Sequence, residues 1–245
     1  MADNKNSALL SERARKLGII LEGTMAVGIE DKGLTSLEIP EGITDLGIEA
    51  FAEMTALVRV KFPRSLKKIG DSAFIGCSAL TEISIPGTVK TVADGAFSYC
   101  DSLSRVTFGE GVELIGDEAF YECPSLKNVR IASSVIEIGD SAFYHCPIKT
   151  AHAPAHLLSS LRSESLTELT VTDGECIDEY ALADCTSLKR ITLSASVTRI
   201  REGAFRADSA LCSVVFLGTE AEWKSVKIAR SNSALSKAAV KFSQK

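Results

Sequence analysis

The 245-residue chain lacks features that would point to a membrane protein or a nucleic-acid-binding protein. No apolar run approaches the roughly 20 residues that a membrane-spanning helix needs. Lys and Arg number 27 against 32 Asp and Glu, and no basic stripe is present that could neutralise phosphates. We therefore expect neither membrane insertion nor nucleic-acid binding.

Common catalytic and metal-binding signatures are also missing. The chain has no G-x-x-x-x-G-K-[ST] phosphate loop, no G-x-S-x-G nucleophile elbow and no C-x-x-C pair. Its three histidines are His145, His152 and His156, and Pro154 argues against one helix presenting the last two. We predict no catalytic residue, no metal ligand and no cofactor. A metal enzyme or hydrolase at this histidine-rich segment stays a remote alternative.

An internal repeat fills most of the chain. Phe51, Phe74, Phe97, Phe120 and Phe143 are spaced 23 residues apart, and a fixed period in the twenties is typical of a solenoid. Each copy contains a leucine followed by two apolar residues at strand spacing, which predicts one strand with one buried face. Counting these motifs predicts about nine rungs, where a rung is one complete copy of the repeat. Such rungs are stable only when stacked on their neighbours.

The rest of each copy predicts how a rung closes. A second apolar pair, such as Val89 and Val92, is expected to run back along the opposite side. The motif G-D-S-A-F follows, and its aspartate is placed to cap a short helical turn that carries Ala and Phe inward. The predicted caps are Asp71, Asp94, Asp117 and Asp140.

Five of the seven cysteines share one repeat position. Small apolar thiols suit a tight buried slot, so we predict a core column, with disulfides or a metal as alternatives. Cys176 and Cys212 lie outside this position and are expected to be the accessible thiols. The predicted core columns are Phe51, Phe74, Phe97, Phe120, Phe143 and Phe205, and Cys77, Cys100, Cys123, Cys146 and Cys185.

Three segments depart from the repeat. Residues 1–33 are predicted to be an N-terminal cap with a helix from Ser7 to Leu17 and a β-leaning segment from Ile19 to Ile29. Leu9, Leu10, Ala14 and Leu17 fall on one side of that helix, which alternatively binds a partner. Residues 34–217 form the solenoid, with an irregular short rung at 148–165. There we expect a short helix after Pro154 with Leu157, Leu158 and Leu161 inward.

Residues 218–245 are predicted to be a C-terminal cap. Thr219 and Glu222 form a capping box ahead of a helix that carries Trp223, the only tryptophan. Its large ring could cover the last open rung, and a short terminal strand is expected to complete the cap.

Outward-facing strand positions form the candidate binding face. Neighbours in one column are cross-rung pairs, so Arg59, Glu82 and Arg105 are expected to alternate in charge down the sheet. This face is either a solvated surface or a concave protein-binding surface of the kind that solenoids use. The candidate residues are Arg59, Glu82, Arg105, Asn128, Arg130, His152, Glu168 and Arg190.

The consensus G-D-x-A-F-x-x-C-x-x-L-x-x-I-x-I-P-x-x-V-x-x-I, found from about Leu34 to Phe216, resembles the BspA-type leucine-rich repeat family of bacterial and protist surface proteins. The resemblance implies a right-handed α/β leucine-rich-repeat solenoid with its parallel sheet on the concave face. It also implies a non-catalytic role in adhesion or in binding a protein or other macromolecule.

The location of the protein is left open by the sequence. Family members usually carry a secretion signal, whereas the segment from Met1 to Arg13 is polar and has no apolar signal core. The resemblance favours a cell-surface or secreted adhesin-like protein. The alternative is an intracellular protein-interaction scaffold.

Overall fold

The computed structural model describes residues 2–243, and the side chains of residues 7–243. The chain divides into two compact units. The first unit comprises residues 1–126 and 134–146, and the second comprises residues 127–133 and 147–245.

The first unit begins with helix α1 (Ala2–Lys16), and Gly18 just beyond its end has a left-handed φ of 68°. Strands β1 (Ile19–Glu22) and β2 (Met25–Ile29) then form an antiparallel hairpin. Only part of the predicted inner side of α1 is buried, at Leu10 and Ala14, whereas Leu9 and Leu17 are 47% and 38% exposed. The prediction was wrong for these two leucines because α1 buries a stripe one residue wide, at i and i+4, against the hairpin.

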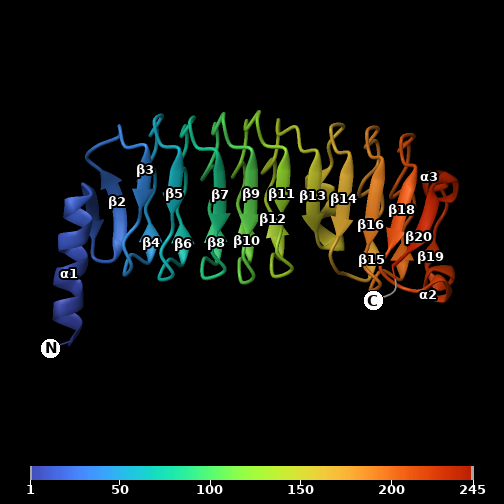
Figure 1. Ribbon diagram of the computed structural model, residues 1–245, viewed down its shortest axis with the longest axis horizontal. Helices are drawn as coiled ribbons and strands as arrows, with labels where there is room; N and C mark the ends of the chain where they lie inside the picture. Colours follow the sequence, from blue (N-terminus) through green and yellow to red (C-terminus); the bar gives the residue numbers. More distant parts are fainter. Residues whose placement is uncertain (1, 244–245) are drawn as a thin grey trace. The chain divides into compact units, whose positions relative to one another are not determined.

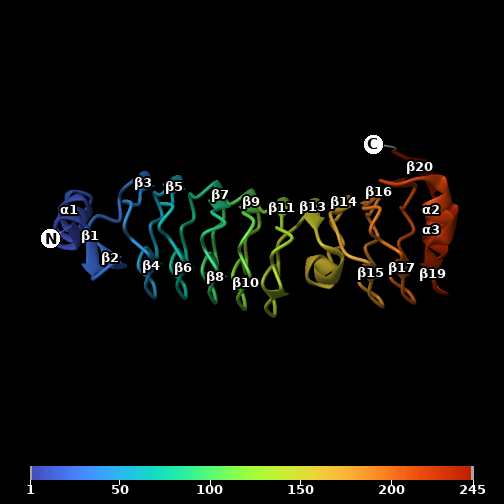
Figure 2. The same cartoon turned by 90° about the horizontal axis from the view of Figure 1, so that it is seen from below.

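The strands of the first unit form a front row and a back row, which Figures 1 and 2 show. The front strands are β3 (Ser36–Glu38), β5 (Arg59–Lys61), β7 (Glu82–Ile85) and β9 (Arg105–Phe108). The back strands are β4 (Asp45–Leu46), β6 (Lys68–Ile69), β8 (Thr91–Val92), β10 (Leu114–Ile115) and β12 (Glu137–Ile138). All back strands pair in parallel in chain order, and β2 joins them at β4. In the front row, β3 pairs with β5 and β7 pairs with β9.

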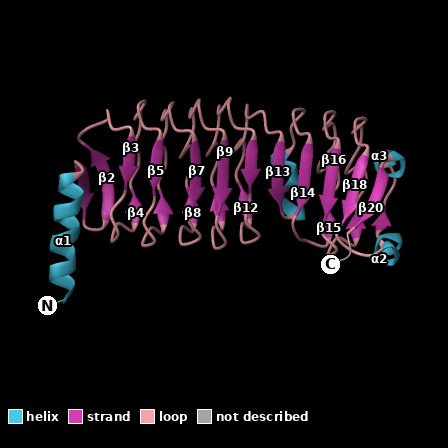
Figure 3. Cartoon of the chain, viewed as in Figure 1, coloured by secondary structure: helices cyan, strands magenta, loops and turns pink. Residues whose placement is uncertain are grey.

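The segment that follows each back strand is a series of turns, drawn as loop in Figure 3, and not the short helix predicted. In every regular copy two residues four apart have positive φ, as at Ser72 (53°) and Gly76 (69°), and such residues interrupt a right-handed helix. Backbone N–H groups instead donate to the next rung, for example from Phe74 to the carbonyl of Ala96 at 2.8 Å. The predicted aspartate caps are therefore wrong. Asp94 and Asp117 each accept a hydrogen bond from the backbone N–H 23 residues later, at 2.9 and 2.8 Å.

Phenylalanine and cysteine columns fill the core of the first unit. The rings from Phe51 to Phe143 stack with centroids 5.2–5.3 Å apart on successive rungs. All seven cysteines of the chain are free, and Cys77, Cys100, Cys123, Cys146 and Cys185 are buried. The thiol of Cys77 donates to the carbonyl of Phe51 at 3.3 Å, and Cys100, Cys123 and Cys146 make the same bond in their copies.

The second unit continues the same pattern. Its front strands, in parallel order, are β11 (Asn128–Arg130), β13 (Thr150–Ala153), β14 (Glu168–Val171), β16 (Arg190–Leu193), β18 (Ser213–Phe216) and β20 (Ala239–Phe242). Its back strands are β15 (Cys176–Ile177), β17 (Arg199–Ile200) and β19 (Lys227–Ile228). The irregular rung contains a 3₁₀ helix, η1 (Ala155–Leu161), which buries Leu157, Leu158 and Leu161 as predicted.

The last segment of the second unit adds to the sheet. Helix α2 (Glu220–Ser225) has the predicted capping box, with Thr219 accepting from the Glu222 N–H and Glu222 accepting from the Thr219 N–H. Trp223 is half-buried with its ring centroid 5.3 Å from that of Phe216. Helix α3 (Ser233–Lys237) follows, and β20 is the expected terminal strand.

All nine predicted front strands are present, so the fold is a parallel-sheet leucine-rich-repeat solenoid of about nine rungs. The right-handed winding, the concave position of the sheet and the cap boundaries at residues 33 and 217 stay predictions.

Candidate protein-binding face

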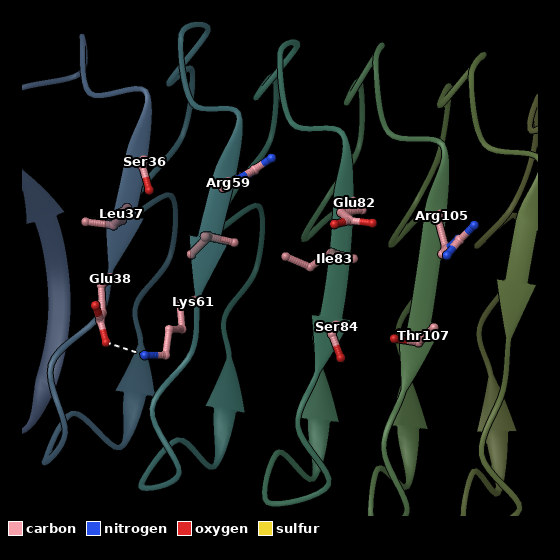
Figure 4. Close-up of a pocket in the computed structure, with 11 residues that line it drawn as sticks. Ser36, Leu37, Glu38, Arg59, Lys61, Glu82, Ile83, Ser84, Arg105 and Thr107 are labelled. Carbon is pink, nitrogen blue, oxygen red and sulfur yellow. Dashed lines mark hydrogen bonds and ion pairs between the residues drawn. The ribbon is translucent and has the colours of Figure 1, made fainter.

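The front strands of the first unit place alternate side chains on an exposed face, because successive residues of a strand point to opposite sides. Leu37 and Ile83 point into the core and are 1% and 3% exposed. Their neighbours point out and line a hollow of about 500 Å³, the β3–β9 groove, shown in Figure 4. Its outward residues are Ser36, Glu38, Arg59, Lys61, Glu82, Ser84, Arg105 and Thr107.

The middle of the β3–β9 groove is more open than the repeat predicts. Val60 on β5 occupies the inward position of its strand, yet it is half-buried and lines the groove. β5 and β7 are neighbours in the chain order of front strands but belong to separate hydrogen-bonded sheets. The groove therefore combines a small apolar surface with a rim of charged side chains.

Arg59, Glu82 and Arg105 alternate in charge along the front strands as predicted, but they do not form ion pairs with one another. Glu82 lies opposite Arg105 in register, yet within the described residues it makes no ion pair with Arg105 or Arg59. Figure 4 shows a contact between Lys61 and Glu38 instead, with Nζ 2.6 Å from Oε1. Long exposed side chains gain little from pairing in water, so the arginines stay solvated. Three basic groups and two acidic groups thus line the groove, and both arginines are available to a partner.

The remaining candidate residues lie on the front strands of the second unit. Asn128, Thr150, Glu168 and Arg190 occupy successive register positions in one column. Glu168 and Arg190 form the expected cross-rung pair, with Oε1 and Nη1 3.8 Å apart. This column has no groove comparable to that of the first unit among the described hollows.

Arg130 and His152 lie opposite each other in the next column of the second unit. Burial, and then the positive charge of Arg130, lower the pKa of His152 below its ordinary value. His152 is thus neutral at neutral pH and serves as a half-buried polar group. Among the residues that the structure describes, no three of His, Cys, Asp and Glu lie together as metal ligands would.

Sequence reasoning missed two features of the surface. It did not anticipate that the half-buried Val60 lines the groove. It also overlooked tyrosines in three successive copies, Tyr99, Tyr121 and Tyr144, whose rings lie next to one another. Their signal is plain in the sequence: each follows the repeat phenylalanine by one or two residues.

A search for spanning segments adds one negative finding. In the described part of the chain, no helix combines the length and the apolar character needed to cross a bilayer.

Comparison with known proteins gives a family and a fold. Residues 30–149 and 159–235 match the family model described as a BspA type leucine rich repeat region, in six copies. A leucine-rich repeat protein of T. pallidum is 21% identical with a TM-score of 0.54, over 93% of this chain and 95% of that one. Another from Bacteroides ovatus ATCC 8483 is 24% identical with a TM-score of 0.47, over 92% of this chain and 71% of that one. No curated protein matches the chain.

Proposed function

Because the chain belongs to the BspA-type leucine-rich repeat family, we propose that it is a non-enzymatic module that binds a protein through its front strands. The β3–β9 groove carries the proposal, since four strands direct their exposed side chains into one hollow of about 500 Å³. Arg59 and Arg105 are its principal binding groups, because unpaired arginines form bidentate bonds with carboxylates and are frequent interface hot spots. The partner surface is expected to be acidic with a small apolar protrusion that fits against Val60.

The role that we propose for this module is adhesion at the cell surface. The family supports that role, since the residues of the groove do not specify a compartment. A panel of purified extracellular-matrix proteins is the direct probe, with binding measured by biolayer interferometry.

A matched pair of variants tests which face binds. Arg59→Glu with Arg105→Glu reverses two charges in the groove, whereas Lys67→Glu with Lys68→Glu makes the same change at the back strand β6. We expect the groove variant to weaken binding at least ten-fold and the β6 variant to leave it within two-fold. Equal effects of the two variants would show that net charge, and not the groove, determines binding.

The second candidate function is an intracellular scaffold, favoured by the seven free cysteines. Free thiols persist in reducing compartments, whereas exported domains usually pair theirs. Thiol counting on protein isolated from its native cells distinguishes the two. Seven free thiols after denaturation would favour the scaffold. Recovery of the protein from the outer surface of its cells would favour the adhesin.

A further inference from the structure

The first unit carries an exposed row of aromatic rings away from the β3–β9 groove. Tyr99, Tyr121 and Tyr144 lie in the turn segments that follow β8, β10 and β12 (Figure 3). The ring centroids of Tyr99 and Tyr121 are 5.7 Å apart, and those of Tyr121 and Tyr144 are 5.6 Å apart. Tyr99 and Tyr144 are 49% and 50% exposed, while Tyr121 between them is half-buried. His145 extends the row, with its ring 4.0 Å from that of Tyr144.

These rings are not needed to close the rungs. In an earlier copy, Ile75 occupies the position of Tyr121 and Tyr144, and Gly76 occupies the position of Tyr99. The turn of that copy keeps the same hydrogen bonds to the next rung. Tyr99 has a φ of 59°, a conformation that glycine adopts freely and that a bulky residue seldom does. Tyr99 therefore adopts this conformation at a cost that a glycine such as Gly76 does not carry.

The surroundings of the row are acidic. The three turn segments, residues 93–102, 116–125 and 139–146, contain six carboxylates and no Lys or Arg. The carboxylates are Asp94, Asp101, Asp117, Glu118, Glu122 and Asp140. The carboxylate of Glu122 accepts a hydrogen bond from His145, with Oε1 2.6 Å from Nδ1. Burial, and then the charge of Glu122, raises the pKa of Tyr121 above its ordinary value.

The second unit contains an example of the contact that such a surface favours. The guanidinium of Arg206 lies over the ring of Tyr180, 5.0 Å from its centroid. Arg206 follows its repeat phenylalanine by one residue, as Tyr121 and Tyr144 follow theirs. Turn segments of this repeat therefore hold tyrosine and arginine in stacking geometry. The tyrosines of the first unit have no arginine of their own turn segments over them.

We propose that the tyrosine row, Tyr99–Tyr121–Tyr144, is a docking surface for an arginine-rich segment of a partner protein. Ring faces attract guanidinium groups within about 6 Å of the centroid, and the flanking carboxylates complement their charge. The surface is separate from the β3–β9 groove, so the proposal does not depend on the function assigned to that groove.

Fluorescence anisotropy with a labelled (Arg-Ser)₅ peptide tests the proposal on the full chain. The ring variant, Tyr99→Gly with Tyr121→Ser and Tyr144→Ser, uses residues that other copies have at these positions, as at Gly76 and Ser98. We expect it to lower affinity about ten- to a hundred-fold, because each exposed cation–π contact contributes about two- to five-fold. The conservative variant, all three Tyr→Phe, keeps the ring faces and is expected to bind within about three-fold of wild type.

Two controls separate this surface from general charge effects. (Glu-Ser)₅ should not bind, and the groove variant Arg59→Glu with Arg105→Glu should bind (Arg-Ser)₅ at least as well as wild type. Equal binding of (Arg-Ser)₅ by the ring variant and the wild type would overturn the proposal, since acidic charge alone would then explain it. Preferential binding of cellohexaose, or a dimer in sedimentation velocity that the ring variant abolishes, would also overturn it.

Discussion

Asp208 should make the stability of the protein fall as the pH rises from about 4 to 7. It follows Phe205 by three residues and so occupies the repeat position of the buried cysteines. Its side chain is 1% exposed. Oδ1 accepts a hydrogen bond from the Cys185 N–H at 3.0 Å, whereas Oδ2 is buried without a hydrogen-bond partner. A carboxylate is poorly accommodated in such a slot.

The size of the effect follows from the pKa. Burial raises the pKa of Asp208 from 3.8 to about 7. The folded state then holds the proton more tightly than the unfolded state, so the stabilising contribution is complete below pH 3.8 and is lost as the pH rises through 7. Three pKa units correspond to about 4 kcal/mol of unfolding free energy. This is a large part of the 5–15 kcal/mol that is typical of domains.

Asp208→Asn removes the charge and keeps an oxygen that can accept from Cys185. We expect its unfolding free energy in urea to exceed that of wild type by about 4 kcal/mol at pH 8 and to differ by under about 1 kcal/mol at pH 4. Asp208→Cys restores the residue of the other copies and should likewise lack the loss of stability that Asp208 causes between pH 4 and 8. Asp101→Asn is the matched control, because Asp101 is an exposed aspartate in the turn segment of another copy.

Parallel pH profiles for wild type and Asp208→Asn between pH 4 and 8 would refute the reasoning. A direct check is the ¹³C carboxyl titration of Asp208. A midpoint near 4 would show that water reaches the side chain and that the slot tolerates a charge.

Three further predictions concern the core and the close contacts between rungs. Phe97→Ala should lower the unfolding free energy in urea by about 3–5 kcal/mol, because its buried ring stacks on both neighbours; a loss under 1 kcal/mol would contradict a packed ring column. Gly87→Ala should lower the melting temperature much more than Gly33→Ala, since a Cβ at Gly87 would clash with the backbone carbonyl oxygen of Glu110; similar shifts would mean that the backbone at Gly87 can move away at little cost. An aromatic disulfide reagent at pH 8 should label Cys212 and Cys176 in the native protein and the other five thiols only in denaturant, because those five are buried. Burial also raises the pKa of Cys77 and Cys185 to about 11. Rapid labelling of all seven thiols in the native protein would count against the buried column.

Much of the fold could be predicted because its signals repeat. The Leu-x-x-apolar-x-apolar motif located all nine front strands, and its spacing also gave the register, as in the pairing of Ser36 with Arg59. The capping box of Thr219 and Glu222 was equally readable, since its residues lie three apart in one segment. Each of these features is local or is fixed by a constant offset, so no knowledge of the three-dimensional packing was needed.

The turn segments could not be read in the same way. Glu118 and Glu122 have φ angles of 55° and 54°, although neither is a glycine, and nothing in G-D-E-A-F-Y-E distinguishes this path from a helical turn. The cause is non-local, because the N–H of Phe120 donates to the carbonyl of Ala142 in the next rung. Hydrogen bonds between rungs thus replace those within a helix, and the backbone adopts a conformation that neither residue favours alone.

The candidate surfaces follow from that same replacement. Tyr121 and Tyr144 belong to successive copies, and helices packed side by side would have separated them by about 8–10 Å, the usual distance between helix axes. Turns bonded from rung to rung instead repeat the same side-chain position at each copy, which is why the two rings lie 5.6 Å apart. The same logic places Arg59 and Arg105 at the same position of their front strands. A repeat of this kind converts any residue that recurs every 23 positions into a row on the surface. The pairing of Tyr121 with Tyr144 is therefore readable from the sequence once the path of the turn is known. Tyr99 follows its repeat phenylalanine by two residues, so its place in the row comes from the structure alone.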